Sequence, residues 1–375
     1  MSIRQEQRGF SLLELLIAMA LTGVVMAAAV TVYKNSVQVS NTVGTRTELQ
    51  SEMRASLNQM ARDLNQAGTG IPLTGLPIPS TASGGVNPFY GCDSTRCYLT
   101  AGTFTSGNLN RITPGDKAGI TTSEPTDAIV VTYIDPIAPA TGVDSVLSSA
   151  TGLDWSGYAT TSIADDGSSL TMPAGTTPAL NDPNKGLMVG DLLLMQNDKG
   201  TAIAEVTTFD ANARKINFAA NDPLLINQPN NNPVTATLAT LSNPRPFVPN
   251  QPHYKATSVA RIIMVSYFVW KDPGDGHLML MRQVNGRTAR PVAEYIENLQ
   301  ITYDMLDDST SPPKLVPNVA DAVVNGTVRP DLIRKIHLVI TARSPYKNAQ
   351  GDYDRMSIAT SVGPRNLSFH DTFAN

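Results

Sequence analysis

The sequence has few of the residues on which catalytic and metal-binding proteins depend. Only two of its 375 residues are cysteine, four are histidine and two are tryptophan. The G-x-S-x-G elbow, the P-loop, the H-E-x-x-H motif and the EF-hand loop do not occur in it. The histidines are scattered, and we expect surface or strand positions for them: His253, His277, His337 and His370. We therefore predict no enzymatic activity, no catalytic residue, no metal and no cofactor.

Charge is also scarce. Charged residues make up 16% of the chain, and the formal net charge is −4. No basic stripe or face occurs, so the sequence does not indicate a nucleic-acid partner. Hydrophobic residues make up 41%, which is enough to build one large or two medium globular units. A chain that is disordered throughout is thereby excluded.

Three pairs of aspartates leave one alternative open. Carboxylates close together can contribute to an oxygen-ligand calcium site, but they are equally common as hydrogen-bond acceptors in turns. The pairs are Asp272 with Asp275, Asp307 with Asp308, and Asp352 with Asp354.

Proline is absent from the first 71 residues, and a long helix is expected there. A continuous helix over residues 10–67 would be roughly 87 Å long. Its second half carries an apolar stripe at spacings of three and four residues, for which core packing is the simplest explanation. The stripe consists of Leu49, Met53, Leu57, Met60 and Leu64. Gly68, Gly70 and Pro72 end the helical pattern.

The first half of this helix can cross a membrane. Between Phe10 and Tyr33 the only charged residue is Glu14. Residues 15–33 would span about 28 Å as a helix, which matches a hydrocarbon core of about 30 Å. Arg4 and Arg8 precede this segment, so the positive-inside rule places residues 1–9 in the cytoplasm and the rest outside.

Glu14 is unusual in this position. A carboxylate in an apolar membrane helix costs roughly 2.5 to 3.5 kcal/mol on insertion scales, and less near the interface. Residues 8–14 read Arg-Gly-Phe-Ser-Leu-Leu-Glu. This string resembles the prepilin processing signal of type IV pilins and of the pseudopilins of type II secretion.

The resemblance implies a role for three residues. Prepilin peptidase would cut after Gly9, Phe10 would become the N-methylated terminus, and Glu14 would serve assembly with other pilins. The physics agrees, because the new amine of Phe10 is a cation and Glu14 of a neighbouring subunit is an anion in the same apolar layer. The protein would sit in the inner membrane with a periplasmic head before assembly, and in an extracellular pilus afterwards.

Two other interpretations of this segment compete. In an ordinary secretory signal peptide, Ala27, Ala28 and Ala29 would be the cleavage site, but Glu14 would interrupt its apolar region and the run is too long. In a plain signal anchor, Glu14 would be a chance residue near the interface.

Residues 68–126 are rich in glycine, proline, serine and threonine, and we expect a mostly irregular connection there. The segment contains both cysteines, Cys92 and Cys97. Since the head is expected in an oxidising compartment, a disulfide closing a small loop is predicted. Two cysteines without a nearby histidine do not complete a zinc site.

Residues 127–375 have the pattern of a β-rich head, with a possible subdomain boundary in the Pro/Asn-rich stretch 227–252. The apolar run 258–270 indicates a strand buried on both faces, and residues 271–276 a hairpin turn. Strict alternation in 299–305 and 336–342 indicates strands with one buried face. Further strands are expected at 126–133, 186–197, 201–209, 214–219 and 354–369, with a hairpin turn at 197–200. The fold class is therefore α+β: a pilin-like long N-terminal helix packed on an antiparallel β-sheet head with an inserted β-rich or loop region.

The head shows a narrower resemblance. Segments at 189–194, 267–269, 280–282, 292–303 and 364–367 are similar to those of minor pilins of the PilW kind, and to their relative, the J-type pseudopilin. The resemblance implies a structural subunit that takes part in initiation or in the tip of pilus assembly. The alternatives are a J-type pseudopilin of a type II secretion system, and a filament-borne adhesin or tethered enzyme that uses the same signal.

Overall fold

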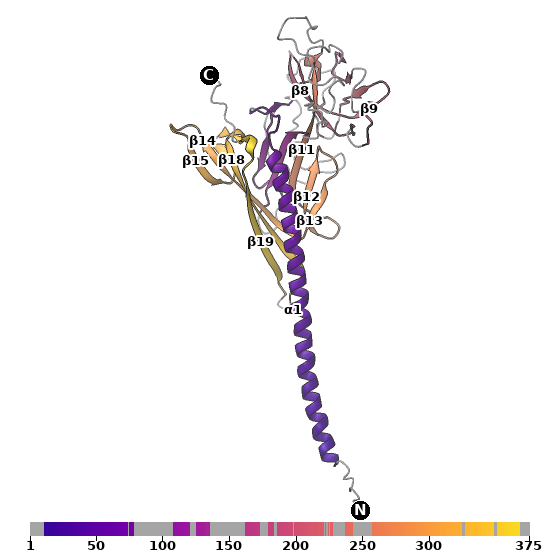
Figure 1. Ribbon diagram of the computed structural model, residues 1–375, viewed down its shortest axis with the longest axis vertical. Helices are drawn as coiled ribbons and strands as arrows, with labels where there is room; N and C mark the ends of the chain where they lie inside the picture. The colour runs from indigo at the N-terminus through magenta and orange to yellow at the C-terminus, as the bar shows by residue number, and fades with distance from the viewer. Residues whose placement is uncertain are drawn as a thin grey trace, which may run out of the picture. The chain divides into compact units, whose positions relative to one another are not determined.

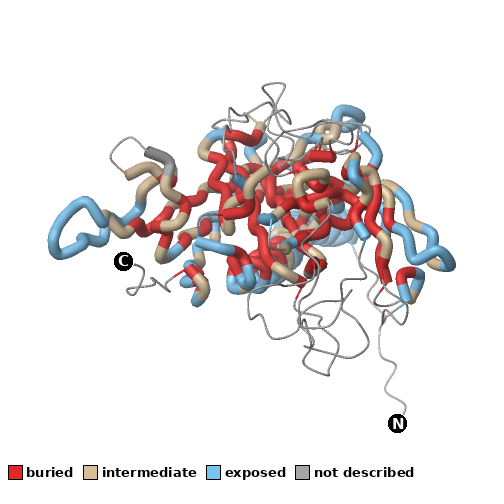
Figure 2. The backbone as a smooth tube through the Cα atoms, turned by 90° about the horizontal axis from the view of Figure 1, so that it is seen from above, coloured by how far each residue is buried: buried red, intermediate tan, exposed pale blue. Residues whose placement is uncertain are grey.

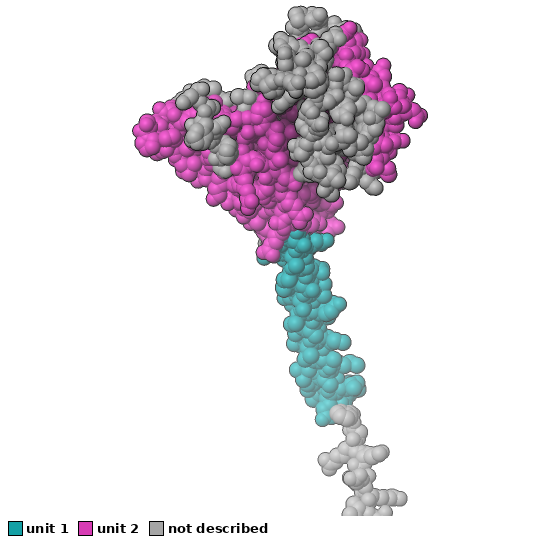
Figure 3. Space-filling model, turned by 45° about the horizontal axis from the view of Figure 1, so that its top comes forward, with its two compact units in different colours: residues 1–51 teal, residues 52–375 magenta. Residues whose placement is uncertain are grey.

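The structure is a computed structural model. It describes residues 11–73, 75–78, 108–120, 125–135, 162–172, 179–183, 186–197, 199–220, 222, 224, 226–227, 237–242, 257–324, 327–348 and 351–367. The chain divides into two compact units, residues 1–51 and residues 52–375, which Figure 3 colours separately.

A single long helix dominates the N-terminal part of the chain. Helix α1 runs through Leu12–Gln66 and has 55 residues, which confirms the predicted helix (Figure 1). Its end coincides with a turn in which Gly68 and Gly70 have φ angles of +76° and +70°. These left-handed conformations favour glycine, and they end the helix before the first proline, Pro72.

The last part of α1 belongs to the second unit and is packed into it. Four residues of the predicted stripe lie there, and each is at most 5% exposed: Met53, Leu57, Met60 and Leu64. Burial of a large apolar side chain contributes roughly 1.5 to 3 kcal/mol. This face of α1 is therefore part of the core of the second unit, as predicted.

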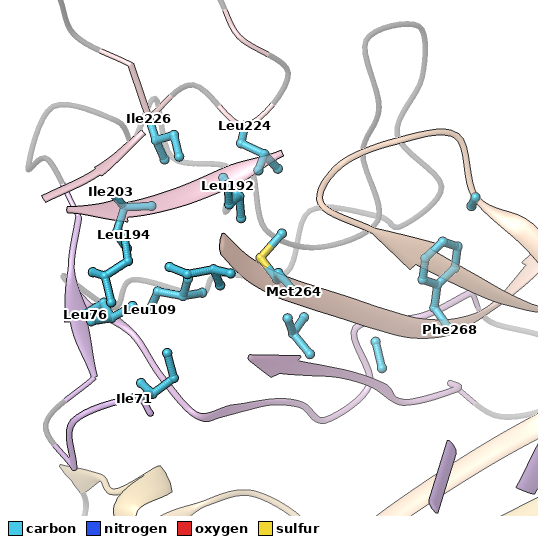
Figure 4. Packing of buried hydrophobic residues seen from close by; sticks show 14 of the residues in the cluster. Ile71, Leu76, Leu109, Leu192, Leu194, Ile203, Leu224, Ile226, Met264 and Phe268 are labelled. Atoms are coloured by element: carbon cyan, nitrogen blue, oxygen red, sulfur yellow. The ribbon is translucent and has the colours of Figure 1, made fainter. Parts of the chain in front are cut away.

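The larger sheet of the second unit is antiparallel. Its path runs β13 (Arg290–Glu294), β12 (Leu278–Val284), β11 (Ser258–Lys271), β4 (Ala128–Ile134) and β3 (Ile112–Gly115), and β7 (Leu192–Asn197) and β8 (Gly200–Glu205) extend it from β11. Strand β11 confirms the prediction of a doubly buried strand, because Val265, Tyr267, Phe268 and Val269 are completely buried. Figure 4 shows part of the apolar cluster on one side of this sheet, around Met264 and Phe268.

The second sheet has four antiparallel strands in the order β15 (Lys314–Val319), β14 (Ile296–Asp307), β18 (Ile333–Lys347) and β19 (Tyr353–Val362). Both β14 and β18 have one buried face, as their alternation predicts. The buried face of β18 is formed by Ile336, Leu338, Ile340 and Ala342, all with 0% exposure. A long helix with antiparallel sheets confirms the α+β, pilin-like fold class.

An additional β region has its own core. It contains β5 (Ser162–Ile163), β6 (Ser169–Thr171), β10 (Lys215–Asn217) and β9 (Thr208–Asp210), and the short helix η1 (Leu238–Leu241). Apolar residues of these elements cluster with those on one face of β7 and β8. Figure 2 shows that the buried residues, in red, run through the middle of the second unit. The remaining elements are β1 (Leu76–Pro77), β2 (Asn108–Leu109), β16 (Val323–Val324), β17 (Thr327–Val328), η2 (Pro330–Leu332) and η3 (Arg365–Leu367).

Several predicted strands are shorter than expected. The predicted strand 354–369 is β19, which ends at Val362 because Gly363 and Pro364 follow it and Pro364 has no N–H to donate; η3 comes next. The predicted strand 214–219 is reduced to β10. The predicted strand 186–197 begins only at Leu192, because residues 186–191 form a turn. In that turn Gly190 has φ of +86°, and the Asp191 carboxylate accepts a hydrogen bond of 2.8 Å from the Met188 N–H. The predicted strand 201–209 is divided between β8 and β9, with Val206 and Thr207 between them. The hairpin between β7 and β8 pairs Asn197 with Gly200, as predicted.

Candidate functional site at the start of the helix

The start of α1 is closed by two reciprocal hydrogen bonds. The Glu14 N–H donates to Ser11 Oγ, and the Ser11 N–H donates to Glu14 Oε2, each at 3.2 Å. The Ser11 carbonyl accepts the first helical bond from the Leu15 N–H. This arrangement is a capping box, which satisfies two N–H groups that a helix leaves unpaired at its start. A carboxylate in the first turn is also favoured by the helix dipole.

The surface of α1 beyond this cap is apolar and exposed. Within the described residues, α1 is the one helix that could cross a membrane by length and composition, and its most apolar stretch is not buried. Exposed fractions of 52% or more occur on all sides of the helix, at Leu12, Leu13, Leu15, Leu16, Ile17, Met19, Leu21, Val24, Val25, Met26, Val30 and Val32. A surface of this kind needs lipid or protein around it, since water solvates it poorly.

The polar side chains of this segment are satisfied within the helix. The Thr22 and Thr31 hydroxyls donate to the carbonyls of Ala18 and Ala27, four residues earlier, at 2.7 and 2.9 Å. Such bonds let a hydroxyl enter an apolar environment at little cost. Glu14 is thus the one ionisable group between Leu12 and Tyr33, and its charge has no counter-charge on its own segment.

The structure describes only some of the other residues considered in the sequence. Gly9, Phe10, Cys92 and Cys97 lie outside the described residues, as do His253 and His370. Of the remaining histidines, His337 on β18 lies 3.0 Å from Asp304 on β14, and His277 stacks on the Tyr295 ring. Neither contact resembles metal ligation.

The aspartates considered for calcium serve local structure. Asp272 Oδ1 accepts from the Gly274 N–H, and Asp275 Oδ1 from the His277 N–H, both at 2.8 Å. Asp308 pairs with Arg329 at 3.2 Å. In the part of the chain that the structure describes, no three acidic, histidine or cysteine side chains are grouped so that they could hold a metal ion.

A buried cluster around Asp63 attaches the end of α1 to the larger sheet. The Asp63 carboxylate accepts hydrogen bonds from the Tyr267 hydroxyl at 2.6 Å, from Arg282 Nε at 2.9 Å and from the Tyr133 hydroxyl at 3.3 Å. The donors come from three adjacent strands, β11, β12 and β4. Burial and the neighbouring Asp63 charge raise the pKa of Tyr267, so its hydroxyl remains a donor. The cluster was not predicted from the sequence, although Asp63 stands between Met60 and Leu64 of the stripe.

A second buried ionisable group lies at the end of β8. Burial, and next the charge of Asp222, raise the pKa of Glu205 to about 8. Its Oε2 accepts from the Leu224 N–H at 3.2 Å, while the Asp222 carboxylate accepts from the Ile226 and Asn227 N–H groups. Burial thus favours the protonated form of Glu205, and its hydrogen bond from the Leu224 N–H holds the segment that follows β10 against β8.

One protein family matches the start of the chain. The family described as "Prokaryotic N-terminal methylation motif" matches residues 4–30. Neither curated proteins nor solved structures give a match to this chain. The matched range contains Gly9, Phe10, the Ser11–Glu14 cap and most of the apolar helix.

Together these findings define the class of protein. The chain is pilin-like: it carries the N-methylation motif of prepilins, and its long helix packs on antiparallel sheets. A protein with this motif is processed by prepilin peptidase and is anchored in the inner membrane by the apolar helix before assembly. Pilin-like proteins are typically structural subunits of a pilus or pseudopilus and not enzymes.

Proposed function

We propose that this protein is a minor type IV pilin of the PilW kind, which takes part in the initiation or the tip of pilus assembly. The observation that carries the proposal is the match of residues 4–30, which continues into an exposed apolar helix capped by Ser11 and Glu14. The head resemblance noted in the sequence supports the subtype.

In this proposal the peptidase cuts between Gly9 and Phe10, and Phe10 becomes N-methylated. Cleavage places a new amine one residue before the cap. Glu14 uses Oε2 in its own cap, and a carboxylate can accept up to four hydrogen bonds. The same side chain can therefore cap its own helix and also pair with the Phe10 amine of a neighbouring subunit. Pairing neutralises two charges that are otherwise costly in an apolar layer.

The size of the head supports a rare, terminal position. A compact unit formed by residues 71–375 has a radius of gyration of about 19 Å and a width on the order of 50 Å. Packed helices lie only about 8 to 10 Å apart. Heads of this width on every subunit would crowd the outside of a shaft, whereas a subunit at the tip has no head above it.

Mass spectrometry of sheared filaments tests both parts of the proposal. We expect the mature chain to begin at Phe10, carrying a methyl group, and to be present at a few per cent or less of the major subunit. Deletion should reduce the number of filaments more than their length. A chain that retains Met1, that begins near Val30, or that predominates in the shaft would contradict the proposal.

Gene context and the phenotype of the deletion separate the competing systems. A J-type pseudopilin would instead be needed for protein secretion, and its gene would adjoin secretion machinery and not other minor pilins. A filament-borne adhesin would leave filament number unchanged on deletion and reduce only attachment.

A further inference from the structure

Strand β19 forms one edge of the four-stranded sheet. On one side it pairs with β18 in continuous register from Ile336 opposite Val362 to Arg343 opposite Arg355. On the other side, no strand of the described part of the chain pairs with it. Figure 1 shows β19 as a long strand of this sheet.

Two hydrogen bonds establish which backbone groups of β19 face outward. The Arg343 N–H of β18 donates to the Tyr295 carbonyl, next to β14, at 3.0 Å. The backbone N–H and C=O of the preceding residue of β18, Ala342, therefore point the other way, toward β19. The Asp354 N–H of β19 donates to Ser344 Oγ of β18, also at 3.0 Å. Because these directions alternate along antiparallel strands, even-numbered residues of β19 bond to β18. The N–H and C=O groups of Ser357, Ala359 and Ser361 therefore point away from the sheet.

The side chains along this edge would admit another strand. Ser357, Ala359 and Ser361 are small and exposed, while Met356, Ile358 and Thr360 on the opposite face are only half-buried. The run 356–362 contains no charge and no proline. A regular, uncharged edge of this kind is what soluble proteins ordinarily avoid, because it pairs readily with other strands.

The other long edges have features that block such pairing. Proline interrupts β15 at Pro317, β13 at Pro291 and β3 at Pro114. The β7–β8 hairpin is joined to η1 and the residue after it, where Asn197 Nδ2 and Lys199 Nζ donate to the carbonyls of Leu241 and Ser242. Edge strands β5 and β9 have only two and three residues. Among the described edges, β19 alone is long and unprotected.

We propose that β19 is a docking edge, which receives an extended strand from the adjacent subunit of the filament. The chemistry of the edge specifies the partner strand. That strand is extended and uncharged over about seven residues. Its side chains are apolar where they lie beside Met356 and Ile358, and they can be large beside Ser357 and Ala359, which are small. This inference rests on the proposed function, since it requires a filament neighbour.

A second free copy is a poor occupant because the area is too small. Seven paired residues form an edge about 24 Å long and about 10 Å thick, or roughly 240 Å² a side. Stable dimers bury about 800 Å² on each partner. A neighbour already held by packed helices needs much less, because tethering raises its effective concentration to about the millimolar range.

The test uses the full-length protein in cells that assemble the filament. A photo-crosslinking amino acid replaces Ser357, and a control copy carries it at Tyr346, which is 82% exposed and lies near the end of β18. Each of these two crosslinker-bearing proteins is also made with Ala359→Pro, which removes one outward-pointing backbone N–H, and with Ala359→Thr, which keeps that N–H. Ala359→Lys is a second block that leaves the pairing with β18 intact.

We expect crosslinks from position 357 to one segment of another filament subunit. Ala359→Pro and Ala359→Lys should reduce them about tenfold, as expected for the loss of an interaction of about 1.4 kcal/mol, and Ala359→Thr should not. The inference is overturned if the protein enters filaments without such crosslinks, if the Pro and Lys variants crosslink normally, or if the partner is a second copy or lies outside the filament. Failure to be processed or to enter filaments would instead refute the proposed function, and this inference with it.

Discussion

Ser11 and Glu14 hold each other in place at the start of α1 through two hydrogen bonds of 3.2 Å, one in each direction. Glu14 thus has a structural role in the isolated subunit as well as the proposed role in assembly. Substitution of Glu14 with Ala disturbs both roles, so a different replacement is needed to separate them.

Replacing Glu14 with Gln separates the cap from the charge. Gln also forms capping boxes, so Glu14→Gln keeps the helix start while it removes the anion. We expect both Glu14→Gln and Glu14→Ala to be cleaved normally, to remain in the membrane and to be absent from filaments. Immunoblots of sheared filaments and of membranes measure this.

The matched control is Ser11→Ala. It removes one bond of the cap, at a cost of about 1 kcal/mol of helix stability, and leaves the charge of Glu14. We expect this variant to enter filaments. If Glu14→Gln also entered filaments normally, charge pairing with Phe10 would be wrong.

The Asp63 cluster should contribute strongly to the stability of the second unit. Asp63→Asn leaves Arg282 partly buried without its anion, and loss of one partner of a buried pair costs about 3 to 5 kcal/mol. Tyr267→Phe should cost more than Tyr133→Phe, because its hydrogen bond is 2.6 Å and not 3.3 Å. Urea unfolding of the purified protein measures these differences, with Arg62→Gln as an exposed control on the same helix. Equal effects of the two tyrosine variants would contradict this account.

Stability should fall as the pH rises from about 4.5 to about 8. Burial beside Asp222 raises the pKa of Glu205 from 4.5 to about 8, so in this range the folded state holds a proton that the unfolded chain releases. Within that range, the free energy of unfolding falls by at most roughly 1.4 kcal/mol for each pH unit. Above that range, Glu205 causes no further loss. Glu205→Gln should flatten the profile, whereas Glu294→Gln at an exposed position should not. Thermal unfolding measured at several pH values tests this, and an unchanged slope in Glu205→Gln would refute it.

We expect Cys92 and Cys97 to form a disulfide in the mature protein. A chain-entropy estimate for so small a loop is about 2 kcal/mol. Cys92→Ser should therefore reduce thermal and protease resistance modestly without preventing folding. Alkylation of protein taken from the periplasmic side, followed by mass spectrometry, would find two free thiols if the prediction is wrong.

Much of α1 could be predicted because its signals are local. The absence of proline before Pro72, the apolar run and the stripe through Met53 and Leu64 each depend on neighbours within one or two helical turns. Strand β11 was predictable for the same reason, since its unbroken apolar run is typical of a doubly buried strand. The capping box was also present as Ser-x-x-Glu at residues 11–14, and it could have been found from that signal.

Other features depend on residues far apart in the chain. Asp63 was visible as a polar residue in an apolar stripe, but its partners Tyr267 and Arg282 lie more than 200 positions away. The turn at 186–191 replaced the first part of a predicted strand. Its Asp191 carboxylate accepts hydrogen bonds from the Met188 N–H and from Arg287, which lies between β12 and β13. Neither the Asp63 contacts nor the contact between Asp191 and Arg287 has a local sequence pattern.

By itself, the sequence determined the cleavage signal, the apolar helix with its single carboxylate, and the alternation that gives β14 and β18 one buried face. These features depend on the type of side chain at fixed short spacings. The geometry of a helix or strand places residues at those spacings on the same face of the element. Only the tertiary structure decided that three strands supply donors to Asp63, that Glu205 and Asp222 share a buried site, and that β19 is an edge. Strand order and charge pairing are settled by which distant segments pack together, and short-range periodicity contains no information about that choice.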